Sequence, residues 1–467
     1  STVTVRHDQQ FNQDFSLKAD VNYLSDPTIN REFADTPTQI RTANLSNSRA
    51  FLTHLWPNYG LQFMLEETRS LSDTTDSRLR RLPDLSLSAF PQRLFKLPLL
   101  LEMRASGTYL ERKDVPESGR ADLFPKLSLP WRILPWMTMI PSVGFRETAY
   151  TQKGTGGEGT SRELFEAQTS FESRFYRSFD IGGERLSRLI HVLEPRVNYW
   201  YINPVDQQDL PQFDSVDFVS PQNRVTYSLT NRLLAKVKGA DGALRTHEVV
   251  SLSLSQSYNL TAKERTFSDI FLSALTPERI DQAVRQETAP SPGNGFSRVQ
   301  ERRLSNLVAA MRASPLQHLA FEGLAAINTE ESRVDGVEVG VRFTVPDYGS
   351  IQAAHTFIRG GATANVPGPF SNQQTGGLVG RILLTPLKNV AINYLGRYDT
   401  LRDESLEQNV VVTYSTCCWL IGIQYVNRLV GPVGTTGSEN SVSVFVELLT
   451  GGAPAPPERG ARYLQRR

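Results

Sequence analysis

Apolar and polar residues alternate along much of this chain with a period of two, which is the spacing of a β-strand that has one apolar and one polar face. In residues 337–345, valine or phenylalanine stands at every odd position, and Glu338, Gly340, Arg342 and Thr344 stand between them. The same alternation occurs in residues 17–23, 225–230, 251–260 and 441–448. These segments predict half-buried strands spread over almost the whole chain.

Turn-forming sequences separate the alternating segments at residues 25–27, 153–157, 238–242 and 431–432. Some connections are short and others run to tens of residues. Short turns on one side of a sheet and long loops on the other are typical of outer-membrane β-barrels, in which the apolar face contacts lipid and the polar face lines a wet lumen. We therefore predict an all-β fold, a large antiparallel transmembrane β-barrel of roughly 20 or more strands with long loops on one side.

The composition agrees with strands that have one apolar and one wet face. Of 467 residues, only 39% are hydrophobic, yet the chain contains 23 phenylalanines and 15 tyrosines, which excludes a disordered polymer. With 50 basic and 49 acidic residues the net charge is +1, so nothing predicts a nucleic-acid partner. The sequence contains no apolar run long enough for a transmembrane helix.

A few segments depart from the strand pattern. Residues 266–287 predict a short helix inside a long loop, and residues 451–467 predict a disordered polar tail after a barrel that covers residues 1–450. Aromatic residues gather near expected strand ends, where they would form interfacial girdles or pack as ordinary strand residues: Trp131, Trp136, Tyr199, Trp200, Tyr201 and Trp419. No fixed-length repeat favours a propeller or a solenoid.

Candidate chemistry is sparse. Cys417 and Cys418 are the two cysteines of the chain, and because neighbouring cysteines rarely bond each other, they are two free buried thiols or partners of cysteines elsewhere. On a strand, Glu194 and Arg196 share one face and His191 lies on the other, which favours an ion pair over acid–base catalysis. The histidines show no metal-ligand spacing. We expect no enzyme activity and no cofactor or metal.

Two segments resemble the LptD family of lipopolysaccharide-assembly proteins, also called the organic solvent tolerance family. The first is a central signature with residues His191, Leu193, Glu194, Pro195, Asp214, Ser215, Asn223 and Arg224. The second is the Cys417-Cys418-Trp419 sequence, followed by a last strand of Ser441, Val442, Ser443, Val444, Phe445, Val446, Glu447 and Leu448. The opening residues 7–26 and residues 82–85 are also similar to this family.

The resemblance implies a barrel that inserts lipopolysaccharide into the outer leaflet of the Gram-negative outer membrane. The lumen would take the saccharide, and a lateral gate between the first and last strands would pass the acyl chains into membrane lipid. The implied partners are an LptE-like lipoprotein plug in the lumen and a periplasmic LptA-like bridge that docks on an N-terminal domain. Cys417 and Cys418 would form disulfides with that domain, and residues 441–448 would form one wall of the gate.

This chain departs from the family pattern in having no N-terminal cysteines and no recognisable periplasmic domain. We interpret it as a barrel that lacks its first strands and that domain. Among the cations expected to face the lumen, Lys18 and Arg342 are candidates for contact with sugar phosphates, or are simply solvated. The alternative functions are a porin-like channel or a plugged nutrient-uptake channel, and more distantly an outer-membrane lipase or protease, or a soluble adhesin made of β-sandwiches.

Overall fold

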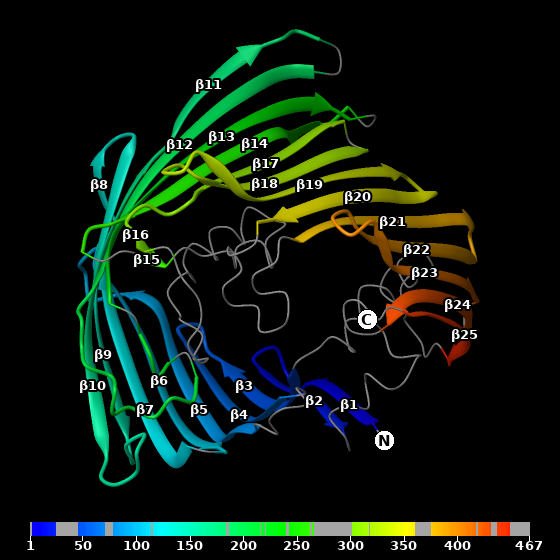
Figure 1. The fold of residues 1–467 in the computed structure, drawn as a ribbon. Helices are drawn as coiled ribbons and strands as arrows, with labels where there is room; N and C mark the ends of the chain where they lie inside the picture. The colour runs from blue at the N-terminus through cyan, green and yellow to red at the C-terminus, as the bar shows by residue number, and fades with distance from the viewer. Residues whose placement is uncertain are drawn as a thin grey trace.

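The alternating segments all lie on β-strands in the computed structural model, with Leu260 falling just outside its strand (Figure 1). The structure describes residues 2–24, 45–70, 78–113, 115–183, 186–214, 216–219, 221–239, 242–261, 264–265, 301–316, 318–359, 375–416, 419–430 and 437–448. The predicted helix at residues 266–287 and the predicted tail at residues 451–467 lie outside these ranges. The described residues include no helix that is long and apolar enough to cross a membrane.

Twenty-three strands form one sheet, and each hydrogen-bonded pair in it is antiparallel. Its first half consists of β1 (Thr2–Gln10), β2 (Phe15–Leu24), β3 (Leu45–Leu55), β4 (Tyr59–Ser70), β5 (Arg78–Arg93), β6 (Leu100–Arg112), β7 (Val115–Ser128), β8 (Trp131–Leu134), β9 (Met137–Tyr150), β10 (Thr160–Ser173), β11 (Phe175–Asp180) and β12 (Leu186–Ile202).

The second half consists of β13 (Gln222–Lys238), β14 (Leu244–Asn259), β17 (Leu307–Leu316), β18 (Leu319–Asn328), β19 (Arg333–Val345), β20 (Gly349–Ile358), β21 (Thr375–Leu387), β22 (Val390–Asp399), β23 (Glu404–Ser415), β24 (Trp419–Val430) and β25 (Gly437–Leu448). The short strands β15 (Glu264–Arg265) and β16 (Glu301–Arg302) pair with each other in a separate sheet. The predicted fold class, a single large antiparallel sheet of roughly 20 or more strands, is confirmed.

The strands pair in chain order with two refinements. Both β7 and β8 pair with β9, and both β10 and β11 pair with β12, so each of these couples occupies a single position in the sheet. Figure 1 shows that the sheet curves into an arc whose first strand, β1, and last strand, β25, lie at its two ends. Within the described residues, β1 pairs only with β2 and β25 only with β24.

The connections differ between the two ends of the strands, as the sequence predicted. At one end, here called the short-turn end, strands are joined by turns of two to six residues, such as residues 56–58, 239–243 and 388–389. At the other, the long-loop end, the connections include residues 25–44, 203–221 and 260–306. Two residues are enough to join two antiparallel strands in a hairpin, so the long connections must do more than reverse the direction of the chain.

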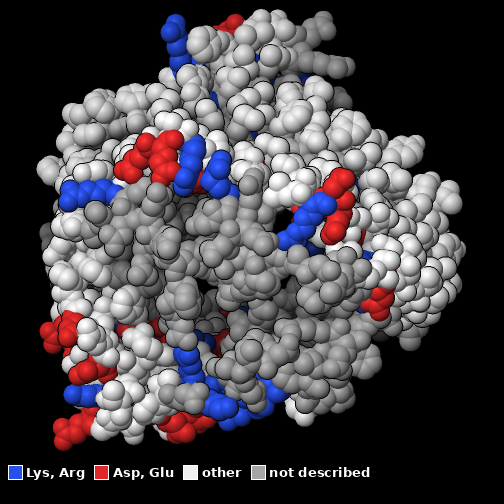
Figure 2. Space-filling model, viewed as in Figure 1, with Lys and Arg blue, Asp and Glu red and all other residues white. Residues whose placement is uncertain are grey.

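The two faces of the sheet reverse the usual distribution of polarity. Apolar side chains of the convex face are exposed, including Val21, Leu229, Val339 and Ile423, whereas polar side chains of the concave face are buried, including Thr148, Thr226, Asn328 and Asn393. In Figure 2 the flank over β20–β24 is almost free of charged side chains. An exposed apolar face of this extent marks contact with something other than water, which agrees with the predicted outward orientation.

The predicted aromatic clusters separate into two kinds. Trp131, Trp136 and Trp419 lie near the short-turn end and are exposed, as side chains of an interfacial girdle would be. Trp200 instead lies on the concave face, where the guanidinium of Arg224 sits 5.0 Å above its ring. Trp200 therefore packs inside the arc.

Candidate functional site

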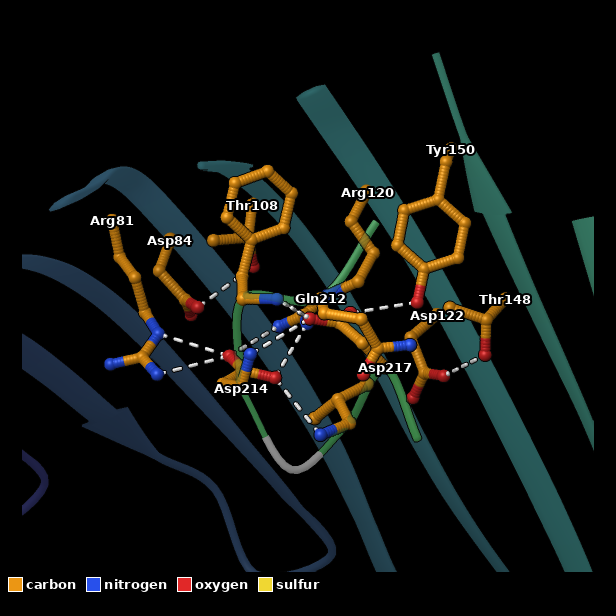
Figure 3. A network of polar contacts seen from close by, with 12 residues as sticks. Arg81, Asp84, Thr108, Arg120, Asp122, Thr148, Tyr150, Gln212, Asp214 and Asp217 are labelled. Carbon is orange, nitrogen blue, oxygen red and sulfur yellow. Dashed lines mark hydrogen bonds and ion pairs between the residues drawn. The ribbon is translucent and has the colours of Figure 1, made fainter. Parts of the chain in front are cut away.

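Part of the concave face lies beneath residues 203–221, the connection between β12 and β13. Leu210, Pro211 and Phe213 of this loop are almost fully buried, which anchors it against the sheet. Its residues interact with β5, β7, β9 and β10, strands that are far away in the sequence (Figure 3). We call this loop and its contacts the loop lock.

Asp217 is the centre of the loop lock. Its side chain is 0% exposed, and its Oδ1 accepts hydrogen bonds from Arg120 Nη1 and from the hydroxyl of Tyr150, both at 2.7 Å. Its Oδ2 accepts from the backbone N–H of Phe213 at 2.7 Å and of Asp214 at 2.8 Å. All four partners are donors, so the site fits an ionised carboxylate, and burial of that charge is compensated by pairing.

Asp214 joins two strands to the loop. Arg120 of β7 binds both of its oxygens, at 2.7 and 3.1 Å, and Arg81 of β5 donates from Nη2 to Oδ2 at 3.0 Å. The backbone N–H of Val216 donates to Oδ1 at 2.9 Å, which closes a tight turn of the kind that aspartate favours. Burial raises the pKa of Asp214, but the hydrogen bond and charge of Arg120 and the charge of Arg81 outweigh it and lower that pKa below its usual value.

Arg162 of β10 fixes the far side of the loop. Its guanidinium donates to the carbonyl oxygens of Val216 and Asp217, at 2.8 and 2.9 Å, and to Gln207 Oε1 at 2.9 Å. Gln207 in turn donates to the carbonyl of Val219 at 2.8 Å, so the two arms of the loop are tied to each other. The arginine thus satisfies backbone groups that the sheet ladder does not pair.

The turn between β9 and β10 supports the loop from the long-loop end. The N–H of Gly154 donates to the carbonyl of Asp209 at 2.9 Å. A Cβ at Gly154 would lie only 2.9 Å from the carbonyl oxygen of Leu210, so any larger residue would push the loop away. Glycine is therefore required here by the close approach of two backbones.

The predicted signature residues divide between the loop lock and the wall. Asp214 belongs to the lock, whereas Glu194 lies on the concave wall, where Arg174 binds it at 2.6 Å. His191 lies on the opposite face from Glu194, as predicted, and its Nε2 is 2.8 Å from Asn231 Oδ1. The other signature residues lie as follows: Leu193 opposite Phe175, Pro195 opposite Leu229, Asn223 accepting from the Tyr199 hydroxyl at 3.1 Å, and Arg224 over Trp200. Ser215 lies outside the described residues.

The remaining predicted site residues lie at the ends of the sheet. The predicted last strand coincides with the second part of β25, whose Val442, Val444 and Val446 are 64–70% exposed. Cys417 and Cys418 lie outside the described residues, but their neighbours Thr416, which follows β23, and Trp419, which begins β24, lie at the short-turn end. Of the candidate concave-face cations, Lys18 lies 3.2 Å from Asp8, and Arg342 is exposed.

Sequence reasoning missed most of the loop lock, namely Arg81, Arg120, Tyr150, Arg162, Gln207 and Asp217. A usable signal was present, because three arginines occupy concave-face positions near the long-loop ends of strands and four aspartates, including Asp214 and Asp217, lie in the long loop. Most polar groups of the lock donate or accept a hydrogen bond that holds the loop, although the Nε atoms of Arg120 and Arg162 are buried without a hydrogen-bond partner. In the described residues no cluster of three or more His, Cys, Asp or Glu side chains is placed to hold a metal ion.

Comparisons with known proteins identify relatives of this chain. The family model described as "LptD: LPS transport system D" matches residues 1–386. The LPS-assembly protein LptD of Nitrosomonas eutropha is 22% identical over 96% of this chain and 58% of its own length. That of Nitrosococcus oceani is 25% identical over 92% of this chain and 54% of its own length. The chain thus spans about half the length of these curated relatives.

Solved structures that match this chain include two receptors. A ferric enterobactin receptor from Pseudomonas aeruginosa is 9% identical, with a TM-score of 0.36 and coverage of 95% of this chain and 72% of that one. The siderophore receptor PirA from Acinetobacter baumannii is 8% identical, with a TM-score of 0.36 and coverage of 96% and 73%.

Proposed function

This chain belongs to the LptD family, and from that membership we propose that it is an outer-membrane barrel that inserts lipopolysaccharide into the outer leaflet of the Gram-negative outer membrane. Residues 1–450 form the barrel, and residues 451–467 form a polar tail. The barrel acts as a transport path, so its side chains have to bind and guide the substrate without reacting with it.

The observation that carries the proposal is the unpaired edge of β25, the strand that contains residues 441–448, in the described part of the chain. Lipopolysaccharide has acyl chains, which need hydrocarbon, and a hydrated anionic saccharide, which needs water. A path for both has to open sideways through the barrel wall, and each ladder hydrogen bond broken in lipid costs several kcal/mol. A seam along β25 avoids that cost, because β25 pairs only with β24 in the described residues.

The outward faces of these edge strands fit the passage of acyl chains. Val3 and Val5 of β1 and Val442, Val444 and Val446 of β25 are all more than half exposed and point to the convex side. The concave side is polar and suits the saccharide. Residues 441–448 therefore form one wall of the lateral gate, and β1 lies across the gap from them in Figure 1.

The connections give the direction of the barrel in the membrane. In outer-membrane barrels the short turns face the periplasm and the long loops face outward. In this orientation Thr416 and Trp419, the sequence neighbours of Cys417 and Cys418, face the periplasm, where disulfides form readily. These cysteines link to an N-terminal periplasmic domain, which docks an LptA-like bridge, and an LptE-like lipoprotein fills the lumen as a plug. Non-reducing gels of the full-length protein test the link, because a Cys417→Ser/Cys418→Ser variant should change mobility.

Photo-cross-linking tests the gate. A photoreactive amino acid replaces Val444 on β25 or Val5 on β1, and the control replaces Leu229, a convex-face residue in the middle of the sheet. Cells that depend on this protein for surface lipopolysaccharide are irradiated, and adducts are detected with an antibody against lipopolysaccharide. We expect several-fold more adduct at the two edge positions than at Leu229.

Two results would contradict the gate. Equal adducts at all three positions would indicate passive contact with outer-leaflet lipid. Failure of the unmodified chain to restore surface lipopolysaccharide would instead reject the transport function and favour a channel for small solutes.

A further inference from the structure

A further free strand edge lies in the middle of the sheet, at the short-turn end. β10 pairs with both β9 and β12, but β11, which follows it, pairs with β12 alone among the described strands (Figure 1). β9 begins at Met137, opposite Ser173 at the end of β10, so β11 extends past the beginning of β9. The six residues of β11 span about 20 Å of edge without a neighbouring strand in the described part of the chain.

The main-chain groups that face this edge follow from one hydrogen bond. The N–H of Ile181, just after β11, donates to the carbonyl oxygen of Ser187 at 3.1 Å. Hydrogen-bonded and non-hydrogen-bonded pairs alternate along an antiparallel ladder. The odd-numbered residues of β11 therefore bond to β12, whereas Tyr176, Ser178 and Asp180 direct their N–H and C=O groups toward the free edge.

The side chains of β11 leave the edge accessible. All six residues are exposed, with Phe179 at 42% on the convex face and Tyr176 at 76% on the concave face. Proteins usually protect such an edge with a proline, a bulge or a charge that points into it. β11 has no proline and no register shift, Asp180 is bound to Arg188 at 2.7 Å, and Arg177 lies 5.2 Å above the ring of Phe179.

The convex face becomes polar at the level of β11. Arg177 lies opposite His191, whose Nε2 is 2.8 Å from Oδ1 of Asn231 on β13. Strands that face hydrocarbon carry apolar side chains on this face. The edge of β11 therefore lies beyond the apolar band, and in the orientation proposed above it faces the periplasm.

The arginines beside this edge are not all neutralised. Arg174 binds Glu194 at 2.6 Å, and Arg188 binds Asp180. Arg177 has no acidic partner in the part of the chain that the structure describes. A strand added beside β11 would place a side chain next to Arg177, and an acidic residue there would complement its charge.

We propose that β11 binds an extended segment of a periplasmic protein by strand addition. The main chain of that segment pairs with Tyr176, Ser178 and Asp180, which is how exposed sheet edges take up peptides. The segment carries an acidic residue beside Arg177 and an apolar residue beside each phenylalanine of β11. The site depends on the proposed function only for its periplasmic orientation, and binding can be measured without transport.

The experiment uses the full-length protein in detergent micelles and a seven-residue peptide that ends in a photoreactive group. In the peptide, valine, glutamate and valine alternate with threonine, and a second peptide has lysine in place of glutamate. We expect the glutamate peptide to cross-link to β11 and the lysine peptide to need a several-fold higher concentration. Arg177→Gln should reduce this preference about threefold, the effect of one exposed ion pair.

The decisive variant is Ser178→Pro, which removes an N–H from the free edge. It should fold, because an edge strand tolerates proline where the missing N–H faces away from the ladder. We expect it to raise the half-saturating concentration of the glutamate peptide about tenfold, by loss of one hydrogen bond and of close approach. The matched control is Ser178→Ala, which keeps the N–H and should bind like the unsubstituted protein.

Several results would overturn the proposal. They are absence of a cross-link from either peptide, equal binding to the Ser178→Pro and Ser178→Ala variants, and equal binding of the glutamate and lysine peptides to the unsubstituted protein. Dimerisation of the unsubstituted protein that Ser178→Pro abolishes would also overturn it and assign the edge to a second copy of this chain. Each of these results leaves the transport function standing if the unsubstituted chain restores surface lipopolysaccharide in cells.

Discussion

The middle of the sheet and its two ends are held together in different ways. In the middle, the loop lock joins β5, β7, β9 and β10 through Asp214 and Asp217, and the side chains of Arg120 and Asp217 are 4% and 0% exposed. At the ends, β1 and β25 each have one strand partner in the described residues, and the ion pairs there are more exposed, as in Arg6–Asp20 at 66% and 41%.

This difference makes one part of the sheet rigid and leaves its ends able to open. Breaking a buried ion pair costs several kcal/mol, whereas exposed pairs contribute about 0–1 kcal/mol each. The ends of the sheet can therefore move while the loop lock keeps the opposite wall intact. A lateral gate needs this arrangement, because a barrel that loosened everywhere would lose its lumen.

The largest expected effect comes from Asp217→Asn. All four hydrogen-bond partners of Asp217 are donors, and each carboxylate oxygen accepts two of these hydrogen bonds. The amide NH2 of asparagine would replace one oxygen and face two donors, so two hydrogen bonds would be lost. We expect a loss of about 3–5 kcal/mol in the free energy of unfolding, the range for a broken buried ion pair. Denaturant unfolding in detergent micelles measures it. A loss below about 1 kcal/mol would mean that the middle is held no more firmly than the ends.

Asp214→Asn should have a smaller effect that depends on pH. The native pKa of Asp214 is lowered, so its ion pairs add stability that is fully present above the usual aspartate value of 3.8 and is lost as the pH falls through the lowered native pKa. We expect the variant to lose about 2–3 kcal/mol at neutral pH, because Asp217 still holds Arg120.

A pH series of unfolding curves checks this prediction. The difference between variant and unsubstituted protein should stay constant above about pH 4 and shrink below it. A difference that persists unchanged to pH 2 would show that Asp214 acts through packing and that its charge is unimportant.

The third prediction concerns the pairing of β24 with β25 at one end of the sheet. Arg428 of β24 donates from Nε and Nη2 to Glu439 Oε2 of β25, at 3.2 and 3.0 Å. Removing this contact in Arg428→Gln should weaken the β24–β25 pairing near the long-loop end by about 1–2 kcal/mol. Amide exchange in β25 should become about tenfold faster, while exchange in β12 stays the same. Equal acceleration in both strands would contradict independent opening of the ends.

The sequence was informative wherever structure depends on neighbours along the chain. Alternation alone located β2, β13, β14, β19 and β25, because the side-chain period of a strand is a local property. The unequal connections at the two ends were also visible, since their lengths can be read directly.

The contacts of the loop lock could not be predicted from the sequence in the same way. Asp214 is bound by Arg120 from 94 residues away and by Arg81 from 133 residues away, and neither spacing has a local signature. Which concave arginine meets which loop aspartate depends on the curvature of the sheet and on the path of residues 203–221. The family resemblance marked Asp214 as part of a signature, but its role required the structure.

The smallest effect should come from an ion pair on the same loop that is exposed. Lys153 Nζ lies 3.6 Å from Asp209 Oδ2, and the two side chains are 41% and 70% exposed. Lys153→Gln should change the free energy of unfolding by at most about 0.5 kcal/mol, because water screens the pair and ordering two mobile side chains offsets the attraction. The same unfolding assay measures it beside Asp217→Asn. A loss close to that of Asp217→Asn would show that any contact to this loop matters equally, and burial would then not explain why the middle of the sheet is firmer than its ends.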